Sequence, residues 1–497
     1  MSDEQMSDEP FVYTKKLFSI FTRNKIRDDV FAITDKESTP SNSLKTVKVI
    51  STEITKMFDD HQLEFINMPI DYSGKFYGIP GGGKTTAIVE RLRRAIKKQL
   101  IPESNGFLLV TFSNQGVKDF IERGCDDTVF NRDTVSTFHS LAGKILSFLA
   151  KMSSRNDIEF SVGETSLKKV VSYSTSIILK VSSEVLRSIP FLRDVRCATI
   201  DEAQDINSDQ YTFIKELSKK LTIPLVLVGD PNQSIYEFQG GSSIYLVEHP
   251  GFCVQSIVNY RSSPEIVDVL NAIMPIPLAH GLRMTSSLDD TITSSRKKPR
   301  LLIGSMRDIL GDILIKVKHF LLKGEIGKTM AVIGPVKNSR IQNEKYTSLA
   351  LNTVLKYLQG NDIPCVRHYR VSDDDGNDEK RSHNKKKRLP TKSTEKDVSS
   401  GSKIHFMTVH ASKGLEFDDV ILLNYQLKTQ SRTVEDMKQY RSCEYIWYVG
   451  FSRPKETLSV YHLEDNDIWP GYEEQLQKHG LMNAYSVNGC KIVIRNK

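Results

Sequence analysis

The sequence predicts an α/β protein with two parallel-sheet domains, and three observations favour this fold class. Short runs rich in Val, Ile, Leu and Phe recur between longer amphipathic stretches, as expected of strands that helices cover on both faces. A glycine-rich loop leads into a segment with helical spacing. A break in composition near residues 248–252 is followed by further strand-like runs, which indicates a second half of the same type.

The expected elements can be placed along the chain. The clearest strand-like runs are FLLVTF (107–112), CATI (197–200), PLVLVGD (224–230), MAVIG (330–334), IHFMTVH (404–410), DVILLNY (419–425) and TLSVYHL (457–463). The helix after the glycine loop has one apolar side, formed by Ile88, Leu92, Ala95 and Ile96. We predict a tail or accessory segment over 1–45, a first domain over 46–250 with a reduced helical insert at about 143–195, and a second domain over 251–497 with a flexible charged loop at 371–402.

Composition narrows the class of protein. The chain of 497 residues is too long to fold around one ordinary hydrophobic core, which indicates more than one domain. Its net charge of +7 mildly favours polyanionic partners. Its six cysteines form no C-x-x-C pair, so a zinc site from cysteines alone is not expected and the thiols are typical of a reduced, intracellular protein. No apolar run approaches the length of a membrane span. We expect the cytoplasm or, from the basic patch at 384–388, the nucleus.

The stretch GIPGGGKTT (78–86) contains the pattern G-x-x-x-x-G-K-[ST], which is typical of a loop that cradles a nucleotide triphosphate. Glycines let backbone N–H groups approach the phosphates, Lys84 supplies a positive charge, and the Thr85 hydroxyl can bind Mg²⁺. The predicted cofactors are therefore ATP and Mg²⁺. The cofactor-binding residues expected from this stretch are Gly78, Gly81, Gly83, Lys84, Thr85 and Thr86.

Paired acids follow the predicted strand at 197–200. Asp201, at the strand end, is suited to hold the Mg²⁺ shell, and Glu202 can orient and deprotonate the attacking water. The alternative reading is a helix N-terminus that carries surface acids. The next strand ends in a polar turn with Gln233, which can sense the terminal phosphate. Arg261 and Arg453, in the second half, can stabilise the charge of phosphoryl transfer across a cleft.

An ordered set of short motifs makes the prediction specific. They are DDHQLEFI (59–66), GIPGGGKTT (78–86), VTFSN (110–114), STFHSLA (136–142), DEAQD (201–205), VGDPNQSIYEFQGG (228–241), NYRS (259–262), MTVHASKGLEFDDVIL (407–422) and YVGFSRPKETL (448–458). In type and order the set resembles the UvrD/Rep-type superfamily 1 DNA helicases. The resemblance covers most of the chain and implies two RecA-like domains with an ATP cleft between them.

The resemblance also implies roles for individual residues. Gln62 would read adenine, Tyr260 would stack on it, and Glu416 would contact the ribose. Gln233 would couple the terminal phosphate to DNA, while Arg261 and Arg453 would contact that phosphate. The residues expected along the single-strand path are Thr111, Phe112, Asn114, Thr137, His139, Tyr236, Phe238 and His410. Aromatic faces such as Phe112 and Tyr236 can stack any base, so binding without sequence preference is expected.

The chain departs from the family pattern in two ways. Phe238 and Gln239 stand where family members usually carry a tryptophan and an arginine. The large second-domain insert is expected to be missing, because one α/β segment at 300–370 and the charged loop occupy its place. Strand separation is therefore expected to be weak or to depend on a partner protein.

Three functions remain open at this level. The leading one is an ATP-dependent DNA helicase or translocase that moves 3′ to 5′ on single-stranded DNA or at single-strand/duplex junctions, in replication, repair or recombination. The second is an RNA-directed superfamily 1 helicase. The third is a DNA-binding ATPase switch without unwinding activity.

Overall fold

The computed structural model describes residues 58–103, 105–124, 130–153, 169–288, 298–334, 341–342, 345–346, 349–369, 403–423, 444–463, 476–477 and 479–486. All of them belong to one compact unit, Phe58–Lys497. The expected tail at 1–45, the charged loop at 371–402 and the basic patch at 384–388 lie outside these residues. Within the described part of the chain, no helix is long and apolar enough to cross a membrane.

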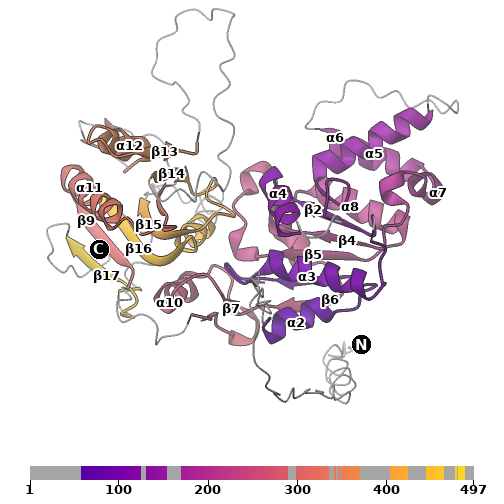
Figure 1. Cartoon of the computed structure of the whole chain (residues 1–497), viewed down its shortest axis with the longest axis horizontal. Helices are drawn as coiled ribbons and strands as arrows, with labels where there is room; N and C mark the ends of the chain where they lie inside the picture. Colours follow the sequence, from indigo (N-terminus) through magenta and orange to yellow (C-terminus); the bar gives the residue numbers. More distant parts are fainter. Residues whose placement is uncertain are drawn as a thin grey trace, which may run out of the picture. The chain divides into compact units, whose positions relative to one another are not determined.

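The first sheet contains six parallel strands in the order β3-β2-β4-β5-β1-β6. Figure 1 labels β2, β4, β5 and β6 of this sheet. Their bounds are β1 (Gly74–Tyr77), β2 (Phe107–Thr111), β3 (Val135–Thr137), β4 (Cys197–Ile200), β5 (Leu225–Gly229) and β6 (Phe252–Gln255). Strand β6 follows the expected domain boundary at residue 250, yet it pairs with β1 through its whole length. The first sheet therefore extends to residue 255.

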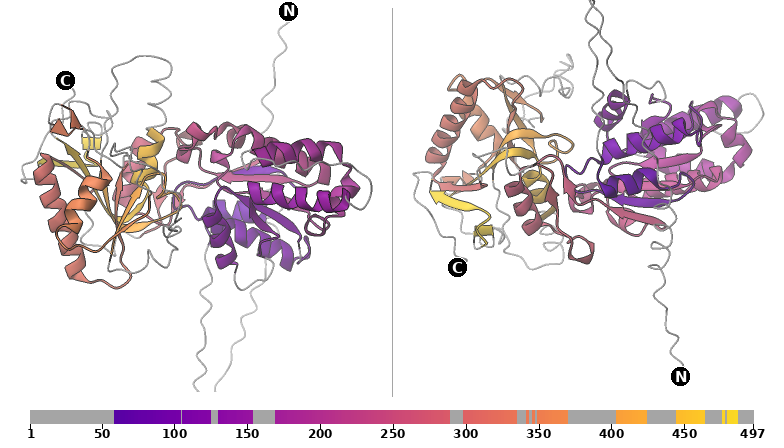
Figure 2. Two further views of the ribbon diagram at one scale, coloured as in Figure 1. Left: turned by 90° about the horizontal axis from the view of Figure 1, so that it is seen from above. Right: turned by 60° about the horizontal axis from the view of Figure 1, so that its bottom comes forward.

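Helices cover both faces of this sheet (Figure 2). On one face pack α2 (Asp60–Asn67), α3 (Lys84–Lys97) and α4 (Asn114–Arg123); on the other pack α5 (Phe138–Ser153), α6 (Val170–Lys180), α7 (Ser183–Arg187) and α8 (Ser208–Leu221). Side chains alternate between the two faces along each strand, so that Phe107 and Leu109 join the first core while Leu108 and Val110 join the second. Helices from the expected insert at 143–195 thus form one layer of the first domain together with α8.

The second sheet contains seven parallel strands in the order β13-β14-β10-β15-β16-β9-β17. They are β9 (Arg300–Gly304), β10 (Met330–Gly334), β13 (Cys365–Arg367), β14 (Ile404–Thr408), β15 (Phe417–Leu423), β16 (Pro454–Leu463) and β17 (Asn483–Ser486). Helices α11 (Met306–Lys323) and α12 (Leu351–Gln359) pack on one face. Helix α10 (Pro264–Ile273) and the helical residues 444–451 pack on the other.

Shorter elements complete the described chain. They are α9 (Ile244–Val247), β7 (Val258–Asn259) paired with β8 (Thr285–Ser286), β11 (Ile341–Gln342) paired with β12 (Lys345–Tyr346), and the 3-10 turns η2 (Pro190–Leu192), η3 (Ala203–Asp205), η4 (Pro231–Gln233), η5 (Glu237–Gln239) and η6 (Ala279–Gly281). The predicted α/β class with two parallel sheets is confirmed. In such sheets ligands bind outside the carboxyl ends of the strands, which is where the chemically distinctive motifs lie.

The buried centre of β5 provides a test of this layered core. Leu227 is fully buried, so Leu227→Ala should lower the free energy of unfolding by about 2–5 kcal/mol through lost burial and a residual cavity. The matched change Leu322→Ala, at a side chain that is 85% exposed on α11, should alter it by no more than about 0.5 kcal/mol. Urea denaturation of both variants measures the difference, and equal losses would contradict the assigned burial.

Candidate functional site

The glycine loop joins the carboxyl end of β1 to the N-terminus of α3. Gly81 and Gly83 have φ values of 66° and 71°, a left-handed conformation that favours glycine, and Gly83 is the residue that caps α3. Lys84 folds back over the loop, and its Nζ donates to the carbonyl oxygens of Gly78 at 2.9 Å and Ile79 at 3.2 Å. The loop thus has the form of an anion cradle, with helix N–H groups and one lysine.

Two side chains border this loop. Gln62, from α2, is 4% exposed and donates from Nε2 to the Gly82 carbonyl at 3.1 Å. The Tyr260 hydroxyl donates to Asp59 at 2.6 Å, and the Tyr260 backbone N–H donates to the Gly81 carbonyl at 2.9 Å. The two residues that were expected to contact a base therefore both lie against the phosphate loop.

Asp201 lies at the carboxyl end of β4 and is 5% exposed, and its Oδ1 has no hydrogen-bond partner. Burial raises its pKa and the charge of Glu202 adds to this, while Lys84 acts in the opposite direction. A buried carboxylate oxygen without a partner fits a bound cation. No cluster of three or more His, Cys, Asp or Glu side chains suited to a metal occurs in the described ranges. The donor set of Asp201 and Thr85 fits Mg²⁺, which commonly binds one or two protein ligands together with phosphate and water.

Glu202 adopts a left-handed backbone conformation, with φ 54° and ψ 39°. This conformation is uncommon for a residue other than glycine, and such strain concentrates at functional sites. Burial acts to raise the pKa of Glu202, but the charges of Lys413, Lys84 and Arg453 and the hydrogen bond from Gln204 together outweigh it, and the pKa is lowered. The carboxylate is therefore kept ionised, as a base that accepts a proton from water must be.

Sequence reasoning assigned no role to Gln204, which the structure places between the two polar strand ends. It is fully buried, donates to Glu202, and accepts from the Asp230 backbone N–H at 3.0 Å. A Cβ at Gly229 would lie 2.3 Å from the Gln204 Oε1, so a side chain at that position would displace Gln204 from these contacts. In the sequence, the position of this amide between acids in DEAQD could have indicated that Gln204 contacts the acidic site.

Gln233 connects the first sheet to the second. Its Nε2 donates to Asp230 at 2.8 Å, and its Oε1 accepts from Arg453 at 3.1 Å. Arg453 is 2% exposed and directs its other donors to Val449, Leu415, Ser412 and Ser452. Burial lowers its pKa to about 9, with a further contribution from the charge of Arg261.

Arg261 lies directly against the phosphate loop. A Cβ at Gly81 would be 2.7 Å from the Arg261 Cβ. The Arg261 guanidinium donates to Glu416 at 2.7 Å, and Lys455 reaches the same carboxylate at 2.9 Å. Burial acts to raise the pKa of Glu416, but these two cations outweigh it and lower the pKa to about 2. Glu416, the expected ribose contact, is thus engaged by cations of the second half.

Asn259 is a second residue that sequence reasoning left without a role. It is fully buried, and its Nδ2 donates to the Pro80 carbonyl at 2.9 Å. Its Oδ1 accepts the backbone N–H groups of Arg261 and Ser262, both at 2.8 Å. Asn259 therefore fastens the segment that carries Arg261 to the phosphate loop.

Lys413 is the third such residue. It belongs to the motif HASKGLEF after β14, and its side chain is 8% exposed. Its Nζ donates to Asp205 and, at 2.8 Å, to the Gln233 carbonyl, and it lies 3.6 Å from Glu202 Oε2. Lys413 and Arg453 both bring positive charge from the second sheet to the acids of the first.

Four of the residues expected along the strand path form one aromatic cluster. The ring centroid of Tyr236 lies 4.9 Å from that of Phe112, 6.0 Å from Phe238 and 5.7 Å from His410. Phe238 is 70% exposed, and the Tyr236 hydroxyl donates to the His410 carbonyl at 3.3 Å. A solvent-facing aromatic beside a cluster of this kind can stack a base.

The remaining expected path residues lie at the carboxyl ends of β2 and β3 and at the following helix starts. Thr111 pairs in register with Thr137, but Thr111 is 1% exposed and its hydroxyl packs towards Gly116. Asn114 and His139 are exposed in the first turns of α4 and α5. Thr86, which was expected to bind the cofactor and not the strand, accepts a hydrogen bond from Arg123 at 3.4 Å. Among the four path residues of this paragraph, Thr111 is the one whose side chain is buried.

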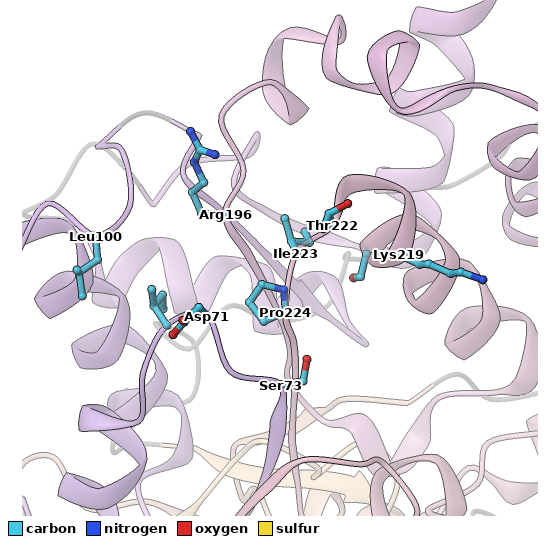
Figure 3. A pocket seen from close by; sticks show the side chains of 10 residues that line it. Asp71, Ser73, Leu100, Arg196, Lys219, Thr222, Ile223 and Pro224 are labelled. Carbon is cyan, nitrogen blue, oxygen red and sulfur yellow. The ribbon is translucent and has the colours of Figure 1, made fainter.

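A cavity of about 570 Å³ lies at the amino ends of the central strands of the first sheet, opposite the carboxyl ends (Figure 3). Among the residues that line it are Ser73, Arg196 and Pro224, each of which directly precedes a strand, and Lys219 of α8. None of the residues of the phosphate loop or of the acidic cluster lines it. It is therefore separate from the site at the carboxyl ends.

Comparison with known proteins agrees with this geometry. The model of the UvrD/REP helicase N-terminal domain matches residues 75–180 and 165–249, and the model of the UvrD-like helicase C-terminal domain matches residues 377–464. Together the two matches span the phosphate loop, the acidic strand end, the aromatic segment of the first sheet, and the segment that carries Lys413 and Arg453.

Two of the following three relatives carry helicase names. A candidate ATP-dependent DNA helicase of Acanthamoeba polyphaga mimivirus is 24% identical over 89% of this chain and 61% of its own length. A candidate DNA helicase of Mycoplasma pneumoniae is 24% identical over 60% of this chain and 49% of its own. The RecBCD enzyme subunit RecB of Chlamydia pneumoniae is 36% identical over 18% of this chain and 10% of its own. The chain thus spans less than two thirds of the length of these relatives, and on the two matched domain models it belongs to the UvrD-like helicase family.

Proposed function

We propose that this protein is an ATP-driven motor that moves along single-stranded DNA. The observation that carries the proposal is the convergence of two buried cations from the second sheet, Arg453 and Lys413, on residues that follow β4 and β5 of the first. A site assembled from both sheets can close when a triphosphate binds and open when its last phosphate leaves. Such alternation is what a stepping motor needs.

The nucleotide is proposed to bind with its phosphates on the loop at 78–83 and at the N-terminus of α3. Lys84 would exchange its contacts with the Gly78 and Ile79 carbonyls for contacts with the phosphates. The base would lie beside Gln62 and Tyr260. Bound Mg²⁺, held by Asp201 and Thr85, would offset negative charge on the phosphates.

Hydrolysis is assigned to Glu202, with three residues that sense the terminal phosphate. Glu202 accepts a proton from the attacking water, since its carboxylate is kept ionised by neighbouring lysines. Arg261 and Arg453 would stabilise the charge that develops on the transferred phosphoryl group. Gln233 already bonds to Arg453, so loss of the phosphate would be transmitted to both sheets.

The DNA path is proposed to run over Phe238 and the aromatic cluster, past the exposed residues Asn114 and His139. Stacking on aromatic faces gives binding without sequence preference. Movement from 3′ to 5′, action at single-strand/duplex junctions and a role in replication, repair or recombination follow from the family resemblance. A partner protein that supports unwinding is part of the proposal.

The phosphate loop gives the first test. Lys84→Ala should reduce ATP hydrolysis in the presence of a single-stranded oligonucleotide by at least about 100-fold, because the charge that stabilises the transferred phosphoryl group is lost. Binding of the oligonucleotide, measured by fluorescence anisotropy without nucleotide, should persist. The matched change Lys98→Ala, at an exposed lysine that ends the same helix, should leave hydrolysis unaffected. Normal turnover by Lys84→Ala would refute the site.

The choice of polymer gives the second test. Single-stranded DNA should stimulate hydrolysis by the wild-type chain more strongly than RNA of the same sequence, as the DNA helicase names of two relatives favour. Duplexes with a 3′ or a 5′ single-stranded tail then report polarity, and removal of a bound protein block reports translocation apart from unwinding. Stronger stimulation by RNA would favour the RNA-directed alternative. Hydrolysis with neither unwinding nor block removal would favour the ATPase switch.

A further inference from the structure

Lys413 is placed to contact both halves of the proposed motor. It lies in the segment between β14 and β15, and its side chain is 8% exposed. On one side its Nζ meets Asp205, the Gln233 carbonyl and Glu202. A buried ammonium group needs partners of this kind, because an unpaired charge in the interior is costly.

On its other side, Lys413 meets the aromatic cluster. Its Nζ lies 5.6 Å from the centroid of the Tyr236 ring, within the range of a cation–π contact. Tyr236 in turn packs against Phe112, and its hydroxyl is bonded to the His410 carbonyl. One side chain therefore touches the candidate base of hydrolysis and the central ring of the candidate DNA path.

We propose that Lys413 is a positioning residue that couples occupancy of the aromatic cluster by DNA to the placement of Glu202 for hydrolysis. The proposal rests on the proposed function, which supplies the two sites. It goes further in naming the side chain that joins them. Lys413 is not assigned a contact with ATP or with DNA.

The physical basis is the shared set of contacts around one ammonium group. A base that stacks on the cluster shifts Tyr236, and the buried Nζ has to move with its partners because it cannot be left unpaired. The carboxylates of Asp205 and Glu202 then move as well. To the extent that these contacts also link the binding of DNA to the binding of nucleotide, that link is reciprocal, so nucleotide binding at the first site should alter DNA affinity at the second.

A purely structural role would leave a different signature. If Lys413 served only to hold Asp205 in a stable fold, its loss would lower stability without changing the ratio of DNA-stimulated to unstimulated hydrolysis. The decisive quantity is therefore that ratio, measured at saturating oligonucleotide so that weaker DNA binding is separated from weaker coupling.

The experiment compares ATP hydrolysis by the wild-type chain and Lys413→Ala, with and without a saturating oligo-dT strand. We expect the stimulation ratio of the variant to fall at least about tenfold, since coupling free energies commonly correspond to 5- to 150-fold effects. Lys413→Arg, which keeps the charge and the donors, should recover part of the ratio. Tyr236→Leu should lower it too, and the double change should lower it by less than the product of the single effects.

Two further variants provide a replacement for an unfolded variant and a control. Lys413→Met combined with Asp205→Asn removes both charges and avoids an isolated buried carboxylate, so it serves if Lys413→Ala fails to fold. Lys328→Ala removes another paired lysine of the second half, bonded to Glu456 and Asp418, and should keep the wild-type ratio.

The outcomes are separable. A folded Lys413 variant with a wild-type stimulation ratio, in a protein whose wild-type hydrolysis responds to DNA, would overturn the coupling role alone. Wild-type protein that hydrolyses no ATP with any strand would overturn the proposed function and the coupling role together. Strictly multiplicative effects of Lys413→Ala and Tyr236→Leu would also contradict the coupling role.

Discussion

Two buried cations of the second sheet, Lys413 and Arg453, depend on the first sheet for part of their hydrogen bonding. Lys413 donates to Asp205 and to the Gln233 carbonyl, and Arg453 donates to the Gln233 side chain. An unpaired charge at either position would be strongly unfavourable, so the polar ends of the strands in both sheets are tied together by the cost of burying charge. The apolar cores of the two sheets are largely separate clusters, but Ile79 and Ile235 of the first half join a core of the second sheet, so apolar contacts accompany these polar contacts.

The same arrangement explains why the pKa values of two adjacent acids are shifted in opposite directions. Asp201 has a raised pKa because burial dominates, whereas Glu202, one residue further on, has a lowered pKa because lysines of both halves lie nearby. Adjacent acids in different environments suit different tasks, one completed by a cation and one ready to accept a proton. Around the loop, Asn259 and Glu416 hold Arg261 in place beside Gly81 through a backbone and an ionic contact.

Much of the fold and of the candidate site could be predicted from the sequence, since strand patterns and motif spacing are local features of the chain. The apolar runs predicted the buried strands β2, β4, β5, β10, β14, β15 and β16. The motifs indicated which strand ends carry the polar residues of the site. The predicted boundary at 250 falls short of β6, because residues 252–255 carry no strong strand pattern and their pairing with β1 is a long-range contact. Gln204, Asn259 and Lys413 received no role for the same reason: their partners lie far away in the sequence. The burial of Thr111 was hidden as well, since it depends on the packing of α4.

The central claim is that groups of the second sheet complete the triphosphate site of the first. The most direct measurement is steady-state ATP hydrolysis by Arg453→Lys at saturating single-stranded DNA, together with its affinity for ADP. Lysine keeps the charge but loses the planar fork that reaches Gln233 and the backbone, so kcat should fall at least about 100-fold while ADP affinity changes by no more than about threefold. Arg367→Lys, at an exposed position on β13, is the matched control. A kcat for Arg453→Lys within about threefold of the wild-type value would contradict the account.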